Sequence, residues 1–167
     1  VSIGSGNNVL LNDTGAIDLG ASTVSGTMGV TASGAITDSG NLTVTGTTTL
    51  AAGAANNITL DAAANNFATV AVASGNNVTL NDTSAINLGN STVFNLAVTA
   101  AGLVDFTGAG TLSVTGTMGL TTTSGGIDDS GTGTLQVLGV TTLAAGAANN
   151  ITLNNANNGF STVVIIS

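Results

Sequence analysis

Short apolar triplets, in which two aliphatic or aromatic residues flank one other residue, recur along the whole chain. This period of two is typical of β-strands with one buried face. Clusters of Gly, Asn, Asp and Ser such as SGNN, NDTG and AAGAANN separate the triplets, and these residues favour turns. The pattern predicts an all-β protein with almost no helix, and the clearest triplets are Val9/Leu11, Ile17/Leu19, Ile58/Leu60, Val78/Leu80, Ile86/Leu88, Val104/Phe106 and Ile151/Leu153.

Internal repeats divide the chain. Residues 4–20 return in similar form at residues 73–89, an offset of 69, and TTLAAGAANNITL at Thr48–Leu60 recurs letter for letter at Thr141–Leu153, an offset of 93. Repeats that divide into short units of about two dozen residues are typical of solenoids. We predict one β-solenoid segment over residues 1–167, with three coils in 1–69, four coils in 70–162 including an extra coil at about 96–116, and the start of a further repeat at 163–167.

Three aliphatic columns, each with one member per coil, support this division and define the expected core. They predict an all-β, parallel, right-handed β-helix of about seven coils of roughly 23 residues, with three short strands per coil. The first column is Val9, Val30, Leu50, Val78, Val98, Leu120 and Leu143; the second is Ile17, Ile36, Ile58, Ile86, Val104, Ile127 and Ile151; the third is Val24, Val44, Val70, Val93, Val114, Val137 and Val163.

The corner after the third column has its own spacing, Val-x-Gly-x-x-x-(Val/Leu), with glycine at Gly26, Gly46, Gly116 and Gly139. The fourth coil departs from this spacing because Asn95 stands where glycine would be. No atypical capping unit is visible, although solenoids normally cover the open edges of their end strands. We therefore expect a stretch of a longer solenoid or a subunit that stacks end to end.

Asparagine is abundant at the turns, and two interpretations of it remain open. Asn8, Asn57, Asn77 and Asn150 each lie just before a core aliphatic residue, where stacked side-chain amides would satisfy turn backbone. Several asparagines also stand in Asn-x-Ser/Thr sequences, which are acceptors for glycosylation in secreted proteins. We favour the structural interpretation; the seven Asn-x-Ser/Thr sites are Asn12, Asn41, Asn57, Asn77, Asn81, Asn90 and Asn150.

The charge composition excludes many functions. The chain has no Lys, Arg, His or Cys, and its formal net charge is −8. Without cationic side chains it cannot neutralise phosphates, so nucleic acids are not expected partners. Without imidazole, thiolate or amine groups most catalytic chemistry is missing, so we expect no enzyme activity and no cofactor. No apolar run approaches the ~18 residues of a membrane-spanning helix, so we expect no membrane insertion.

Three ligand-binding hypotheses, for ice, carbohydrate and Ca²⁺, compete with a purely structural role. The residues before the third column form a row rich in threonine, Thr23, Thr43, Thr69, Thr92, Ser113, Gln136 and Thr162, and such a row on a flat solenoid face can bind ice. Exposed Phe94 is a candidate anchor for a carbohydrate. Turn carboxylates can hold Ca²⁺, and the weak candidates for this metal site are Asp13, Asp82, Asp128 and Asp129.

The repeat segments NNVTLNDTSAINLGNSTV, LSVTGTMGLTTTSGGIDDSG and TTLAAGAANNITL resemble the repeat regions of filamentous haemagglutinin-like adhesins, which bacteria export by two-partner secretion. The resemblance covers the whole chain, without the family's N-terminal secretion domain, and the complete absence of Lys and Arg departs from the family's usual composition. It implies a secreted shaft at the bacterial cell surface, with a role in adhesion and biofilm. The expected partners are further copies of the chain and glycans on a host or neighbouring cell.

Overall fold

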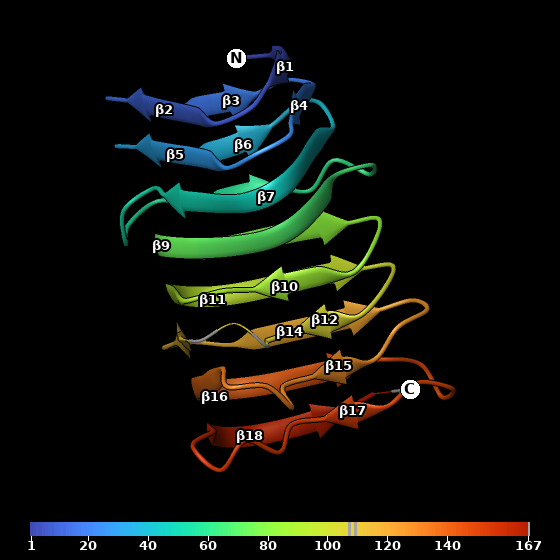
Figure 1. The fold of residues 1–167 in the computed structure, drawn as a ribbon. Coiled ribbons are helices and arrows are strands. Elements are labelled where there is room, and N and C mark those ends of the chain that lie inside the picture. The colour runs from blue at the N-terminus through green and yellow to red at the C-terminus, as the bar shows by residue number, and fades with distance from the viewer. Residues whose placement is uncertain (107, 109, 167) are drawn as a thin grey trace.

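The protein is a stack of parallel β-strand turns that runs from the N-terminal to the C-terminal end (Figure 1). The computed structural model describes residues 1–106, 108 and 110–166. Within that part of the chain there is no helix, and hence none that could cross a membrane. The strands are β1 (Ile3–Gly6), β2 (Val9–Asp13), β3 (Ile17–Leu19), β4 (Ser22–Val24), β5 (Met28–Ala32), β6 (Ile36–Asp38), β7 (Leu42–Ala51), β8 (Ile58–Leu60), β9 (Asn66–Asp82), β10 (Ile86–Leu88), β11 (Ser91–Ala100), β12 (Val104–Asp105), β13 (Thr111–Val114), β14 (Met118–Thr122), β15 (Ile127–Asp128), β16 (Thr134–Ala144), β17 (Ile151–Thr152) and β18 (Gly159–Ile165).

The predicted parallel β-solenoid is confirmed, with turns that are shorter and more numerous than the repeat arithmetic suggests. The rod has about 8 turns of about 21 residues, where the sequence predicted about seven coils of roughly 23. Strand register shows that the turns also vary in length: the step from Val9 to its partner Met28 is shorter than the step from Met118 to its partner Thr141. The predicted coil length assumes that each repeat offset is a whole number of coils, but neither offset is a whole number of turns.

The strands form two stacks, which we call the first and the second stack. β9 is 17 residues long and belongs to both: Val70 pairs with Thr48 of β7 in the first stack, and Val78 pairs with Ile58 of β8 in the second. Before β9 the long strands lie in the first stack, and after it they lie in the second. The first stack holds β1, β2, β4, β5, β7, β9, β10, β12, β15 and β17; the second holds β3, β6, β8, β9, β11, β13, β14, β16 and β18.

This crossing places identical sequence segments on opposite sides of the rod. Leu50 of the first TTLAAGAANNITL segment pairs with Val30 in the first stack, whereas its counterpart Leu143 pairs with Leu120 in the second stack. A sequence repeat is therefore not a whole number of turns and ends part of the way around one. By that point the long strands have passed from the first stack to the second, and the short strands from the second to the first.

Glycine marks the bend within the long strands. Three strand segments per turn are visible in β4, β5 and β6, but in β7 and β16 two of the three run together through Gly46 and Gly139. The Gly46 N–H donates to the Gly26 carbonyl at 3.0 Å, and the Gly139 N–H donates to the Gly116 carbonyl at 2.9 Å. A Cβ at either donor glycine would overlap the carbonyl of the turn beside it, which explains the spacing of the corner motif.

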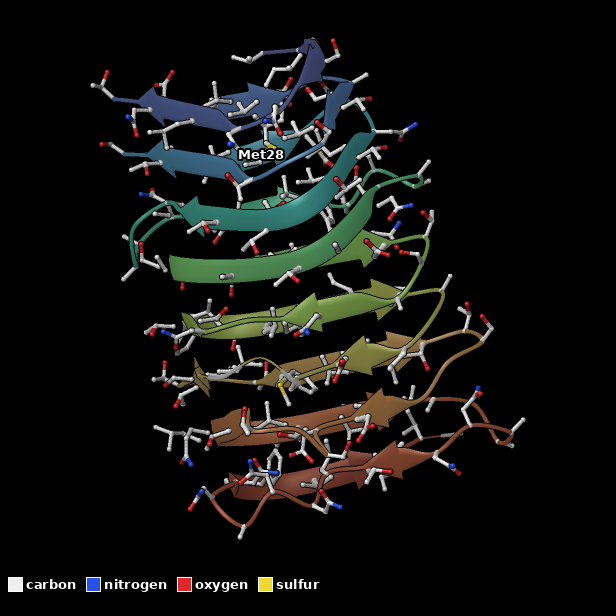
Figure 2. The ribbon with its side chains drawn as sticks, in the orientation of Figure 1. Met28 is labelled. Atoms are coloured by element: carbon white, nitrogen blue, oxygen red, sulfur yellow. The ribbon has the colours of Figure 1, made fainter. Side chains whose placement is uncertain are left out.

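The aliphatic columns lie in the interior, and within each half of the rod their members stack directly on one another. Met28, 1% exposed, also lies inside the rod (Figure 2). The stacked runs are Val30–Leu50, Ile17–Ile36–Ile58 and Val24–Val44 before β9, and Val98–Leu120–Leu143, Ile86–Val104–Ile127–Ile151 and Val93–Val114–Val137 after it.

Across β9 the columns change partners because the chain passes from one stack to the other. Ile58 pairs with Val78 instead of Ile86, and Leu50 pairs with Val72 instead of Val78. In the third column Val44 pairs with Phe67 instead of Val70. Each column inferred from the sequence is therefore two shorter columns in the structure.

The column members at the two ends differ from the rest in burial. Val9 pairs with Met28, so that Leu11 is the residue beside Val30. Val9 and Ile151 are only partly buried, and Val163 is 43% exposed, whereas the other column residues are buried. Residues 163–165, expected to start a further repeat, continue β18, and Ser167 lies outside the described residues.

Candidate functional site

A ladder of polar side chains runs along one corner of the rod. Asn57 Oδ1 accepts hydrogen bonds from the Asn77 backbone N–H at 3.2 Å and from Asn77 Nδ2 at 3.0 Å. Asn77 Oδ1 accepts from Asn95 Nδ2 at 2.8 Å, and Asn95 Oδ1 accepts from the Thr117 N–H at 2.7 Å. Asn95, which stands where the corner motif has glycine, thus connects Asn77 to Thr117 in this ladder. Asn8 makes the corresponding contact with Thr27 at the N-terminal end, 3.0 Å from its N–H.

Two Asp–Asn pairs form partly buried clamps between turns. Asp38 Oδ1 accepts from the Asp61 N–H at 3.0 Å, and Asp38 Oδ2 accepts from Asn65 Nδ2 at 2.5 Å. Asn65 Oδ1 then accepts from the Leu42 N–H at 2.7 Å, at the first residue of β7. Asn65 and Leu42 are both 0% exposed, so this amide oxygen satisfies a backbone N–H that water does not reach.

The second clamp repeats the first in the other half of the rod. Asp129 Oδ1 accepts from the Asn154 N–H at 2.7 Å, and Asp129 Oδ2 accepts from Asn158 Nδ2. Asn158 Oδ1 accepts from the Leu135 N–H at 2.9 Å, near the start of β16. Neither clamp was predicted, although the sequence carries a signal for both: an asparagine precedes Phe67 and Phe160 by two residues in the two repeats.

The four aspartates that were weak candidates for a calcium site each accept hydrogen bonds from protein donors. Asp13 Oδ1 accepts from the Gly15 N–H at 2.6 Å, and Asp128 Oδ1 accepts from the Ser130 N–H at 2.9 Å, both across a local turn. Asp82, 2% exposed, accepts from the Phe67 N–H at 2.6 Å. Asp129 is buried in its clamp. Among the described residues no three carboxylates converge on one point.

The outward rows are irregular. Thr23 and Thr43 stack, but the next residue in that row is Asn66, because Thr69 pairs with Thr47. In the second half the row continues from Thr92 through Ser113 and Gln136 to Gly159. The threonine row expected for ice binding is therefore divided at β9. Phe94 is 50% exposed and Leu138 is 69% exposed, so both present apolar surface to the outside.

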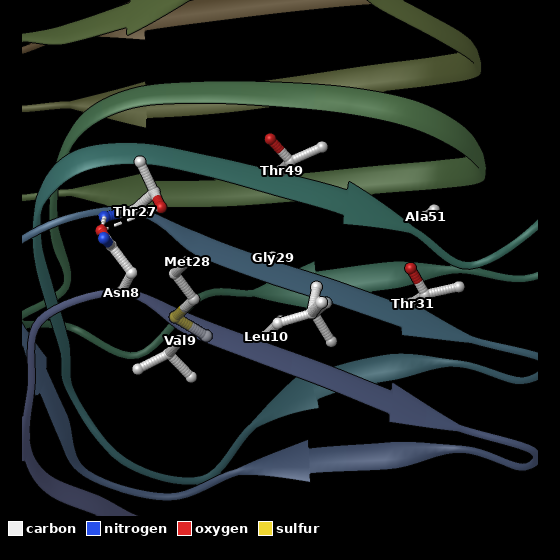
Figure 3. Close-up of a pocket in the computed structure, with 10 residues that line it drawn as sticks. Asn8, Val9, Leu10, Thr27, Met28, Gly29, Thr31, Thr49 and Ala51 are labelled. Carbon is white, nitrogen blue, oxygen red and sulfur yellow. Dashed lines mark hydrogen bonds between the residues drawn. The ribbon is translucent and has the colours of Figure 1, made fainter.

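Two shallow depressions lie over the outer faces of the strands, and each has a glycine in its lining. The first has a volume of about 410 Å³ and lies over β2, β5 and β7, where the exposed Leu10 side chain stands beside Gly29 (Figure 3). Its counterpart in the second half surrounds Gly119 and has a volume of about 350 Å³. Neither lining contains a charged side chain. Their polar groups are threonine hydroxyls and asparagine amides, so they offer neutral hydrogen-bonding surface without a built pocket.

The continuous core, the parallel stacks and the ladders between turns define a β-solenoid repeat protein. The chain belongs to the family described as repeats of unknown function (DUF5649), whose model matches residues 6–74, 75–128 and 107–167. The first two matches begin at positions 6 and 75, a separation equal to the shorter repeat offset in the sequence. No curated protein and no solved structure matches the chain.

Proposed function

We propose that this chain is part of the structural shaft of a secreted bacterial filament or surface adhesin, with a role in adhesion and biofilm. The observation that carries the proposal is the uninterrupted interior: buried aliphatic residues follow one another from Ile17 to Leu143 through all the intervening turns. A shaft needs axial continuity, and parallel strand pairing between successive turns supplies it.

The outer surface also favours a shaft over a binding module. A carbohydrate site would use several exposed aromatic rings, and Phe94 is the one large aromatic side chain among the exposed apolar residues of the described chain. The resemblance of the repeats to filamentous haemagglutinin-like adhesins supports the same function and suggests export to the cell surface. In this proposal the chain works without catalysis and without a cofactor, and its main partner is a further copy of itself.

Surface labelling of the source bacterium tests this function. Antibodies raised against residues 1–167 are expected to decorate fibres on intact cells, seen by immunogold electron microscopy, and a deletion strain is expected to lose both label and biofilm. A cytosolic marker, which should be labelled only after permeabilisation, is the control. Label that appears only in permeabilised cells would refute the surface location, and a deletion strain with unchanged biofilm would refute the adhesive role.

A further inference from the structure

The two ends of the rod contain residues whose sequence counterparts are buried against each other at β8 and β9. Ile58 and Leu60 pair in register with Val78 and Leu80, and all four are at most 1% exposed. By the longer repeat offset, the counterparts of Ile58 and Leu60 are Ile151 and Leu153 in the last turn. By the shorter repeat offset, the counterparts of Val78 and Leu80 are Val9 and Leu11 in the first turn. At the ends these counterparts are only partly buried. Each end thus presents one half of a junction that is complete inside the rod.

Polar contacts at the internal junction also have counterparts at the ends. Asn77 donates to Asn57 across the junction, and the Phe67 N–H donates to Asp82 at 2.6 Å. At the ends, the repeat offsets place Asn150 and Phe160 on the C-terminal side, and Asn8 and Asp13 on the N-terminal side. Joining the ends in the same register would therefore bring amide to amide, and Asp13 to the backbone N–H of Phe160.

The C-terminal turn already has the conformation that the internal junction uses. Gly53 and Gly146 both have positive φ, at 83° and 71°. In the two loops the Asn56 and Asn149 backbone N–H groups donate to these glycines at 3.1 Å. The side-chain amides of the same asparagines donate to the Ala52 and Ala145 carbonyls at 2.7 Å in both cases. The surface that accepts residues 78–80 inside the rod is thus repeated at the C-terminal end.

We propose that the C-terminal turn of one copy of this chain binds the N-terminal turn of a second copy, in the register that joins residues 58–60 to residues 78–80 inside the rod. This inference rests on the proposed shaft function and names how its units join. β17 of one copy would lie beside β2 of the next, so that the first stack continues across the joint. The second stack would continue from β18 to β3 of the next copy.

The joint requires an exchange of terminal strands. Val1 accepts a hydrogen bond from the Gly20 N–H at 2.6 Å, as Val70 accepts from the Gly89 N–H at 2.8 Å. Val163 is the repeat counterpart of both valines. Residues 163–165 of the first copy would therefore occupy the place that residues 1–3 occupy in the second copy. Val163 and Ile165, 43% and 66% exposed, would become buried as Val70 and Val72 are in the rod.

A pair of exposed apolar side chains provides a matched test of this joint. Ile165, 66% exposed, lies in the strand that would be exchanged, whereas Leu138, 69% exposed, lies on the side of the rod. The intact chain should form a concentration-dependent series of oligomers in sedimentation velocity. Ile165→Asn should reduce the association constant about tenfold or more, because an apolar side chain is no longer buried at the joint. Leu138→Asn should assemble as the unchanged chain does.

Engineered cysteines test the register, since the chain has no cysteine of its own. Thr59 pairs with Thr79 at the internal junction, and the counterparts at the ends are Thr152 and Leu10. A chain carrying both Leu10→Cys and Thr152→Cys should give a ladder of disulfide-linked oligomers on oxidation, because paired strands bring Cα atoms within disulfide range. A mixture of the two single variants should give only dimers. Leu10→Cys combined with Leu138→Cys should give no ladder.

The outcomes separate this inference from the shaft function. An intact chain that stays monomeric, an equal effect of Ile165→Asn and Leu138→Asn, or a ladder that forms equally with Leu138→Cys would each overturn the proposed joint. None of these results bears on whether the chain lies at the cell surface, which the immunogold experiment decides independently. Conversely, a ladder in the predicted register would support the joint even if labelling of intact cells fails.

Discussion

Asn65 and Asp38 are hydrogen-bonded across successive turns, Nδ2 to Oδ2 at 2.5 Å, while Asn65 Oδ1 holds the Leu42 N–H at 2.7 Å. One buried amide therefore satisfies a carboxylate on one side and the first N–H of a long strand on the other. Asn158 makes the same pair of contacts with Asp129 and Leu135. The clamps help to fix the positions along the rod at which β7 and β16 begin.

Replacing Asn65 by alanine should therefore destabilise the rod by about 1–3 kcal/mol, because the Leu42 N–H loses its partner in a place without water. Thermal or urea unfolding followed by circular dichroism measures the loss. The matched change Asn41→Ala removes the same group from an exposed position and should cost less than about 0.5 kcal/mol. Equal losses in the two variants would contradict the role of the clamp.

A charge in the core should be far more costly than a change on the outside. Ile86, 1% exposed, stacks on Val104, so Ile86→Asp would place an unpaired carboxylate in a narrow apolar interior and should cost several kcal/mol or prevent folding. Thr79→Ser, in an outward position of β9, should change stability little. Comparable midpoints of thermal unfolding for the two variants would show that the assigned facing is incorrect.

Buried threonine hydroxyls offer a route to greater stability. Thr48 is 0% exposed between Met28 and Val70, and its Oγ1 has no hydrogen-bond partner among the described residues. Thr48→Val keeps the shape and removes the unsatisfied hydroxyl, so the free energy of unfolding should rise by about 1 kcal/mol. Thr49→Val, at the exposed neighbouring position, should not raise it. A loss of stability in Thr48→Val would indicate that the hydroxyl has a partner.

Glycine at the bend of the long strands should be sensitive to a single methyl group. Gly46→Ala would drive a Cβ into the Gly26 carbonyl and should cost about 1–3 kcal/mol through displaced backbone. Gly119→Ala supplies the contrast, because nothing lies within 4 Å of its Cβ position, and it should be neutral or slightly stabilising. Chemical denaturation of the two variants in parallel makes the comparison; a tolerated Gly46→Ala would show that the turns can separate locally.

The strand class and the interior positions followed from the sequence because a period of two and the regular return of similar segments can be read without knowing the fold. The stack to which each strand belongs did not. Leu50 and Leu143 stand in identical segments yet lie in different stacks, because the length of β9 carries the chain from one stack to the other. Neither repeat is a whole number of turns, so the position of a segment around the rod shifts from one repeat to the next. A short stretch of sequence does not show how large the total shift is.

Some of the polar contacts were likewise predictable from the sequence and others were not. Asn57 and Asn77 were expected in amide ladders because each precedes a core residue, and the structure joins them at 3.0 Å. Asn65 precedes Phe67 by two residues, as Asn158 precedes Phe160, but this spacing does not show which turn lies above Asp38, and the burial of Asn65 depends on that turn. Contacts between turns that differ in length cannot be assigned before the register is known.

The repeated clamp makes the length of the rod adjustable by recombination. Asp38 takes its backbone donor from Asp61, directly after Leu60, and Asp129 takes its donor from Asn154, directly after Leu153. A crossover within the two identical TTLAAGAANNITL segments would pass from Leu60 to Asn154, delete one whole repeat, and still offer Asp38 an N–H at the same place. Unequal exchange would thus lengthen or shorten the rod in whole repeats while this hydrogen bond to Asp38 is kept, so that the length of the rod can change between generations without a change of fold.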